Sequence, residues 1–266
     1  ADPRTSSSAH TCFEILLQAY GFERGMQLAK QIGGNARAFA NNSSEIPRLC
    51  AVGEAACGLT MDFYAYAQID KVGEVIRFVL PEGNTLVNAD AVGILKGAEG
   101  NVAAQRFVDF LLTEDAARLW MLRVGEPGGP LRDELTRGAI RPGVYEQSAG
   151  RTNVRENPFL ADYRLRFDSA MAGARWNLLN DLLGATLVDP HAELVAAMRA
   201  ITRCADVALR QRAMERLNEL PVTETEVEAM RQRWTDAEFR GNQKIAWTGF
   251  ARRQYRDVIA LLGGGQ

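Results

Sequence analysis

Hydrophobic residues recur at helical spacing soon after the start of the chain. Four apolar side chains fall on one helix face: Phe13, Leu16, Leu17 and Tyr20. The polar stretch before them contains Pro3, which favours an extended backbone, and then the hydroxyls of residues 5–8. Because Ser and Thr are common N-cap residues, this pattern predicts a loop that enters a helix.

Two such polar starts are candidates for binding an anion. Thr5, Ser6, Ser7 and Ser8 precede the first helix, and Asn42 with Ser43 precedes a second helical run over residues 46–52. A helix N-terminus presents unpaired N–H groups and the positive end of the helix dipole, and small side chains let an anion approach both. The functional hypothesis is an oxyanion cradle, and the alternative is an ordinary helix cap.

Apolar runs without helical spacing predict strands between these helices. Residues 55–69 suit a buried strand running into a loop or helix, and residues 75–80 and 91–95 suit two short strands, the former closed by Pro81, Glu82 and Gly83. Another helix is expected over residues 23–32. Alternating strands and helices predict an α/β fold of packed layers.

The pattern turns helical from residue 101, a loop-rich connector is expected after residue 130, and the C-terminal third is expected to be almost wholly helical. Helices are predicted near residues 102–111 and 114–122, before a break at the Gly- and Pro-rich residues 125–130. Four long amphipathic helices should follow, at about 164–186, 190–218, 222–240 and 243–262. We therefore expect an α/β domain over residues 1–130 and a helical extension over residues 131–266.

Composition excludes several classes of protein. The 266 residues are 47% hydrophobic and carry a formal charge of −2, so a globular core is expected and a field that would hold nucleic acid is not. No run approaches the roughly 20 apolar residues of a membrane helix, and the first residues do not resemble a signal peptide. We expect neither nucleic-acid binding nor membrane insertion.

Motifs for covalent or metal chemistry are not found. Two histidines, His10 and His191, lie far apart, and no nucleotide-binding glycine motif occurs. A hydrolase triad of Ser8, His10 and Asp62 is conceivable, but it lacks the Gly-x-Ser-x-Gly elbow. The cysteines show no CxxC pairing and are expected to be buried free thiols: Cys12, Cys50, Cys57 and Cys204.

The polar groups that remain lie at the ends of predicted elements. They are the hydroxyls of residues 5–8, the amide and hydroxyls of residues 42–44, and Asp62 with Tyr64. Ligands of open α/β sheets bind at such edges. Since no base, nucleophile and orienting group converge, these positions favour binding over catalysis, and we do not expect an enzyme.

Five segments in order resemble the extracellular solute-binding proteins of ABC importers, in the branch that includes ferric-iron-binding and phosphonate-binding members. The segments are DPRTSSSA at residues 2–9, GEAACGL at 53–59, FVLPEG at 78–83, ILKGA at 94–98 and AQRFVDFLLTE at 104–114. The resemblance covers about residues 1–130. The helical remainder is similar to the C-terminal extension of longer members.

The resemblance implies a periplasmic or extracellular protein with two α/β lobes that close on a ligand and deliver it to a membrane permease. It implies that Ser6, Ser7 and Ser8 form the oxyanion cradle, and that Asn42 and Ser43 face the same cleft. It also implies that this chain has a type II periplasmic-binding-protein lobe, with a return segment at about 89–112, and lacks the N-terminal lobe.

Iron-binding relatives use two adjacent tyrosines where this chain has Phe63 and Tyr64. Phenylalanine offers no oxygen to Fe(III), which weakens the iron interpretation and leaves the anion interpretation intact. Tyr66 could supply the second oxygen only if a local turn brought both tyrosines to one face.

The resulting hypothesis is a solute-binding component that captures a phosphate-like or phosphonate-like solute, or Fe(III) with a synergistic anion. No resident cofactor is expected. Asp62 and Tyr64 would be available for a cation, with Tyr64 as the metal ligand. The alternatives are a serine-dependent hydrolase or transferase that uses the same loop as an oxyanion hole, and a fragment without binding activity of its own.

Overall fold

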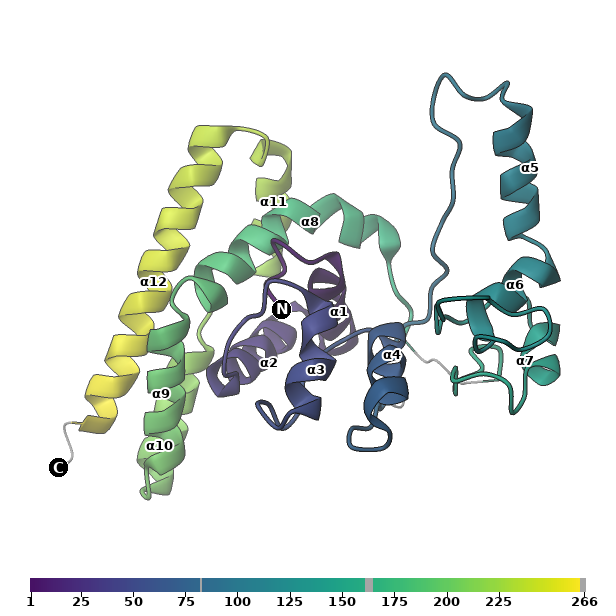
Figure 1. Ribbon diagram of the computed structural model, residues 1–266. Helices are drawn as coiled ribbons and strands as arrows, with labels where there is room; N and C mark the ends of the chain where they lie inside the picture. Colours follow the sequence, from purple (N-terminus) through teal and green to yellow (C-terminus); the bar gives the residue numbers. More distant parts are fainter. Residues whose placement is uncertain (82, 161–164, 264–266) are drawn as a thin grey trace. The chain divides into compact units, whose positions relative to one another are not determined.

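The computed structural model describes residues 1–81, 83–160 and 165–263, and they form an all-helical protein (Figure 1). The elements in order are α1 (Ser7–Tyr20), α2 (Phe22–Asn35), η1 (Ser43–Glu45), α3 (Ile46–Ala51), α4 (Asp62–Val72), α5 (Val102–Leu111), α6 (Glu114–Met121), α7 (Gly143–Gln147), α8 (Ser169–Leu183), η2 (Gly184–Val188), α9 (His191–Arg203), α10 (Val207–Asn218), α11 (Glu224–Met230), η3 (Arg231–Arg233) and α12 (Ala237–Gly263). They group into two compact units, which are described separately.

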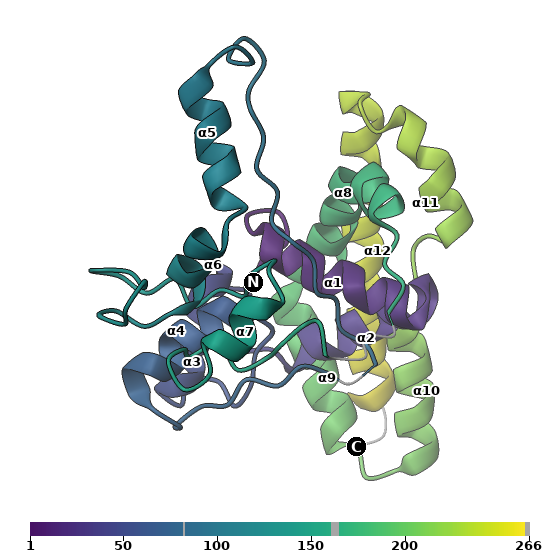
Figure 2. The ribbon, with the colours of Figure 1, turned by 90° about the vertical axis from the view of Figure 1, so that its right-hand side faces the viewer.

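Unit 1 comprises Ala1–Ile46 and Leu165–Gln266 and holds the larger core. In it α2 packs on α1 and α9, and α12 packs on α9 and α10, as both ribbon views show (Figure 2). The side chains that fill this core are mainly leucines, with Met26, Trp247 and Tyr255. The Tyr255 hydroxyl donates to the carbonyl of Thr186 at 2.6 Å, inside the π-helical turn η2, where normal helical bonding is interrupted.

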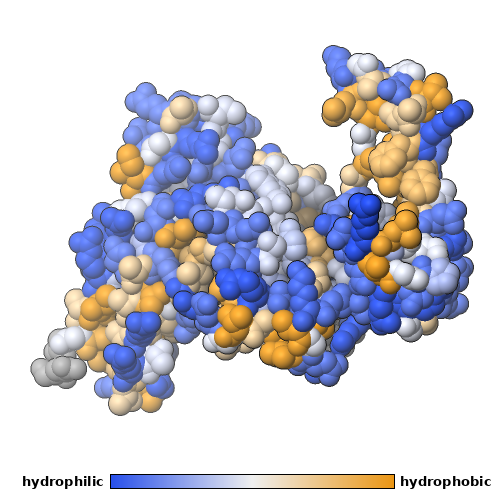
Figure 3. All heavy atoms as spheres, viewed as in Figure 1, coloured by the Kyte–Doolittle hydropathy of each residue, from blue (hydrophilic) through white to orange (hydrophobic). Residues whose placement is uncertain are grey.

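Unit 2 comprises Pro47–Arg164 and has a small core. Its buried cluster joins α6 and α7 to the loops that follow them: Ala117, Met121, Ala139, Val144, Tyr145 and Val154. Helix α5 buries none of its residues, and Figure 3 shows apolar side chains gathered over it. Three of them are exposed: Val102, Phe107 and Phe110.

The expected α/β class is wrong, because the described residues contain no strand and 59% of them are helical. Residues 75–80 and 91–95 run without a sheet ladder. Val79 is 65% exposed and Leu95 is 81% exposed, whereas Ile76, Phe78 and Leu80 are half-buried. A strand needs a neighbour to satisfy its N–H and C=O groups. These apolar runs find no such neighbour in the described part of the chain.

Within residues 55–69 the predicted strand does not form, but the helix into which it was expected to run does. Helix α4 begins at Asp62, and Ala65, Tyr66 and Ile69 are buried along one side of it. The predicted turn at residues 81–83 includes Glu82, which lies outside the described residues.

Most predicted helices are confirmed, with changed boundaries. The helix expected at 190–218 is interrupted before Asp206, whose carboxylate caps α10 by accepting from the N–H of Leu209 at 2.9 Å. Helix α12 begins earlier than expected and runs for 27 residues. The helix expected from residue 164 is described from Ser169 as α8, and residue 164 itself lies outside the described residues.

The predicted division near residue 130 falls inside unit 2 and, as a functional division, stays a prediction. The four cysteines are free thiols, but none has the expected full burial: Cys57 is exposed and the other three are half-buried. None of the described helices has the combination of length and apolar character needed to cross a bilayer.

Candidate functional site

The first helix begins at a tightly bonded turn. The carboxylate of Asp2 accepts from the N–H of Arg4 at 2.8 Å, and the Asp2 carbonyl accepts from the N–H groups of Thr5 and Ser6. Ser6 has an extended backbone and is the N-cap of α1, with its Oγ accepting from the N–H of Ala9 at 3.3 Å. The predicted helix cap is thus confirmed at Ser6.

The second polar start has its own cap. The Asn42 side chain accepts from the N–H of Ser44 at 3.0 Å and caps η1, the 3₁₀ turn that leads into α3. Ser43 is buried at the start of this turn. Both predicted helix starts are therefore capped by the residue types that the sequence indicated.

The structure brings these two starts together. The Oγ atoms of Ser6 and Ser43 are 2.8 Å apart, and the Thr5 hydroxyl donates to the carbonyl of Asn41 at 3.0 Å. The N–H of Asp2 also donates to the carbonyl of Ala40 at 2.8 Å. We call residues 5–8 with Asn42 and Ser43 the hydroxyl cluster.

Two backbone donors of the hydroxyl cluster are available. The N–H groups of Ser7 and Ser8 have no hydrogen-bond partner among the described residues, as is usual in the first turn of a helix. Ser7 and Asn42 are exposed, and Ser8 is half-buried. An anion at this point would meet two N–H groups and the positive end of the α1 dipole.

The one arginine beside the cluster is shared by two carboxylates. The Arg4 guanidinium contacts Asp2 at 2.9 Å and Asp189 at 2.8 Å, and these hydrogen bonds raise the arginine pKa. The side chain lies against Gly184, where a Cβ would come within 2.7 Å of it. The Arg4 guanidinium is therefore already paired, and an anion at the hydroxyl cluster would be bound by neutral donors.

His10 is not arranged for catalysis. It is fully buried, its Nδ1 lies 2.7 Å from Oδ1 of Asn180, and its ring lies against Trp176. Burial lowers the His10 pKa, against the opposing effect of the Asn180 hydrogen bond. The Asn180 amide occupies the position at Nδ1 where a catalytic triad would have a carboxylate. Among the described residues, no serine hydroxyl forms a hydrogen bond with the His10 imidazole.

Asp62 and Tyr64 lie in unit 2, on the first turn of α4. Burial raises the pKa of the Asp62 carboxyl. The Phe63 ring lies 3.8 Å from the Arg137 guanidinium carbon and 4.4 Å from the Tyr64 ring. The site is thus an aromatic and cationic surface more than a cluster of oxygen ligands.

Tyr66 does not join Tyr64 on one face. Residues two apart on a helix point to nearly opposite sides, and Tyr66 is buried against Phe78 at 5.5 Å between ring centroids. The described residues also contain no group of three or more His, Cys, Asp or Glu side chains that could hold a metal. The role of Tyr64 as a metal ligand stays a prediction.

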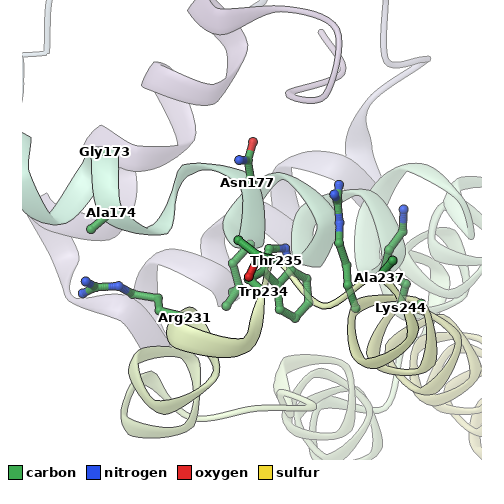
Figure 4. A pocket seen from close by; sticks show the side chains of 11 residues that line it. Gly173, Ala174, Asn177, Arg231, Trp234, Thr235, Ala237 and Lys244 are labelled. Carbon is green, nitrogen blue, oxygen red and sulfur yellow. The ribbon is translucent and has the colours of Figure 1, made fainter.

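Sequence reasoning missed a cavity in unit 1. It lies between α8, η3 and α12, has a volume of about 490 Å³, and is lined by Arg231, Arg240 and Lys244 among others (Figure 4). The available signals were two glycines inside helices, Gly173 and Gly241, and two cations one turn apart on α12.

Comparison with known proteins bears on the first part of the chain. Residues 1–121 match the family of bacterial extracellular solute-binding proteins. An uncharacterized protein of Haemophilus influenzae is 28% identical over 119 residues, which make up 45% of this chain and 34% of that protein. The chain thus spans about a third of the length of this relative. No solved structure matches the chain significantly.

Proposed function

We propose that this chain is the solute-binding component of an ABC importer and that the hydroxyl cluster binds a small oxyanion-bearing solute. The observation that carries the proposal is the 2.8 Å contact between Ser6 and Ser43, which joins two capped helix starts 37 residues apart. The family match over residues 1–121 includes both starts and supports the same class of function. This function would place the protein outside the cytoplasmic membrane, with a permease as its partner.

Neutral donors suit a solute that is bound and then released. The free N–H groups of Ser7 and Ser8 could donate to phosphate or phosphonate oxygens, and the exposed Asn42 amide could add a donor from the second start. Arg4 is already paired with two carboxylates. Affinity would then come from directed hydrogen bonds and the helix dipole, with little salt dependence.

The test removes one backbone donor and keeps the helix. Ser7 is the first residue of α1, its N–H is unpaired, and Ser6 before it is extended, so Ser7→Pro should fold normally. Losing that donor should weaken the binding of inorganic phosphate about tenfold, equivalent to about 1.4 kcal/mol, as measured by calorimetry. Ser7→Ala, which keeps the N–H, should have a smaller effect.

Val207→Pro is the matched control, because Val207 is exposed at the first position of α10 after an extended Asp206. It should leave phosphate binding unchanged. Equal losses in Ser7→Pro and Val207→Pro, or no phosphate binding by the unaltered chain, would count against the hydroxyl cluster.

Two further ligands and one substrate separate the alternatives. Fe(III)-citrate is the first ligand. An increase in the melting temperature that Tyr64→Phe abolishes would favour the iron form of the proposal. Methylphosphonate that competes with phosphate would favour the phosphonate form. We expect no covalent chemistry, so turnover of p-nitrophenyl acetate that Ser8→Ala abolishes would favour the hydrolase instead.

A further inference from the structure

The cavity in unit 1 combines a surplus of cations with unfilled space. Arg231 comes from η3, and Arg240 and Lys244 come from successive turns of α12. Figure 4 shows Arg231 and Lys244 at opposite ends of the cavity. No carboxylate is among the lining residues in the described part of the chain.

Asp181 is a buried carboxylate that does not line the cavity, and it contacts two of these cations. Asp181 accepts from Nε of Arg240 at 2.5 Å and from Nζ of Lys244 at 3.1 Å, and it is 4% exposed. It also accepts from Nε1 of Trp234 at 3.2 Å. Burial alone would raise the Asp181 pKa, but the hydrogen bonds from Arg240 and Lys244 lower it overall, so the carboxylate is charged.

The same geometry leaves donors for a ligand. Arg240 uses only its Nε in the contact with Asp181, and its two terminal nitrogens have no partner among the described residues. Arg231 is paired with Glu228 at 2.5 Å through one of its terminal nitrogens. The three cations that line the cavity are thus paired with only two carboxylates, Asp181 and Glu228. Neither carboxylate lines the cavity.

The glycines of the cavity wall have no packing reason to be there. A Cβ at Gly173 or Gly241 would meet no atom within 4 Å, and neither residue has a positive φ. Glycine inside a helix costs about 1 kcal/mol relative to alanine. Glycine at these two positions, on α8 and α12, thus leaves open space in the cavity although it destabilises both helices. This is consistent with room for a ligand.

We propose that this cavity binds a small organic polyanion that carries at least two carboxylate or phosphate groups. One group would lie between Arg240 and Lys244, where a guanidinium can bind an oxyanion through two parallel hydrogen bonds. The other group would face Arg231, and the ligand body would lie along Gly173 and Gly241. The site is separate in residues from the hydroxyl cluster, and its occupancy does not depend on the function proposed for that cluster.

Citrate is the probe, because it carries three carboxylates on a body small enough for a cavity of this volume. Calorimetry at constant ionic strength should show saturable binding to the unaltered chain. Arg240→Gln should weaken it about tenfold or more, as expected for loss of a charged bidentate donor. Lys244→Gln repeats the test and keeps the Arg240 contact with Asp181.

Gly241→Leu should abolish citrate binding without unfolding the helix, because leucine is a good helix former and its Cβ meets open space. Arg256→Gln is the matched control. It removes the same charge from an exposed position of α12, about 24 Å along the axis from Arg240. It should leave citrate affinity within about twofold of the unaltered value.

Three results would overturn the proposal. They are no saturable citrate binding, equal weakening by Arg240→Gln and Arg256→Gln, and undiminished binding by a folded Gly241→Leu variant. Ser7→Pro should not alter citrate affinity. If Ser7→Pro weakens citrate binding and Gly241→Leu does not, citrate binds at the hydroxyl cluster. That result would contradict this inference and support the proposed function.

Discussion

At the residue scale, a buried ion pair joins α1 to α8. The Arg175 guanidinium contacts both carboxylate oxygens of Glu14, the shorter distance being 2.7 Å, and both side chains are almost fully buried. Arg175→Met would leave the Glu14 carboxylate buried without its cation. We expect this change to lower the free energy of unfolding by about 3–5 kcal/mol, measured in urea.

The double variant Glu14→Gln/Arg175→Met removes both charges and should be less destabilised than Arg175→Met alone. Arg256→Met, at an exposed position, should change stability by less than about 0.5 kcal/mol. A double variant as unstable as the single one would show that packing, rather than the unpaired charge, dominates the cost.

Lys30 is another buried ionisable group, and it makes stability depend on pH. Its Nζ donates to the carbonyls of Leu217 and Glu219 at the end of α10 and to Oε1 of Gln254, the last at 2.8 Å. Burial lowers the Lys30 pKa to about 7. The pKa in the unfolded chain is about 10.4, so between these values the unfolded state binds more protons than the native state.

The contribution of Lys30 to stability should therefore rise with pH from about 7 to about 10, by at most about 1.4 kcal/mol per pH unit, and be constant below pH 7. Lys30→Met should remove this rise. The measurement is the difference in unfolding free energy between the unaltered chain and the variant across the range. A difference that does not change with pH would contradict the lowered pKa.

At the element scale, the helical glycines fall into two groups. A Cβ at Gly25 would come within 2.6 Å of the Leu17 Cα, because α1 and α2 pack closely there, whereas Gly173 and Gly241 face open space. Gly173→Ala and Gly241→Ala should each raise the free energy of unfolding by about 0.5–1 kcal/mol. Gly25→Ala should lower it, and a gain in Gly25→Ala would contradict the close packing.

Local signals predicted helices well and strands badly. The N-caps Ser6 and Asn42 were recognisable because a cap bonds residues two or three positions away. A strand depends on a partner that can lie anywhere along the chain. The apolar runs at residues 75–80 and 91–95 have strand composition but no partner in the described residues, so the prediction failed at that step.

At the scale of the whole molecule, the grouping of residues 165–263 with residues 1–46 was not predictable. It rests on contacts between residues far apart in sequence, such as Glu14 with Arg175 and His10 with Asn180, separated by 161 and 170 positions. Periodicity does not show which helix faces meet. The cavity was missed for the same reason, since α8 and α12 each contribute only part of its wall.

Each half of the hydroxyl cluster was visible in the sequence as a polar helix start and a candidate anion site, and the family resemblance assigned both halves to one ligand. The contact of Ser6 with Ser43 is a finding of the structure. The binding role of the hydroxyl cluster, and of Asp62 and Tyr64 in unit 2, stays a prediction.

The most direct test is a phosphate titration of the ¹⁵N-labelled chain, followed by amide NMR. Our account predicts the largest saturable shifts at the N–H groups of Ser7 and Ser8, because they are unpaired and would donate to the proposed ligand. Gly241, in the cavity wall, should shift much less. Shifts that are largest outside residues 5–8 and 42–43, or that do not saturate, would contradict the central claim.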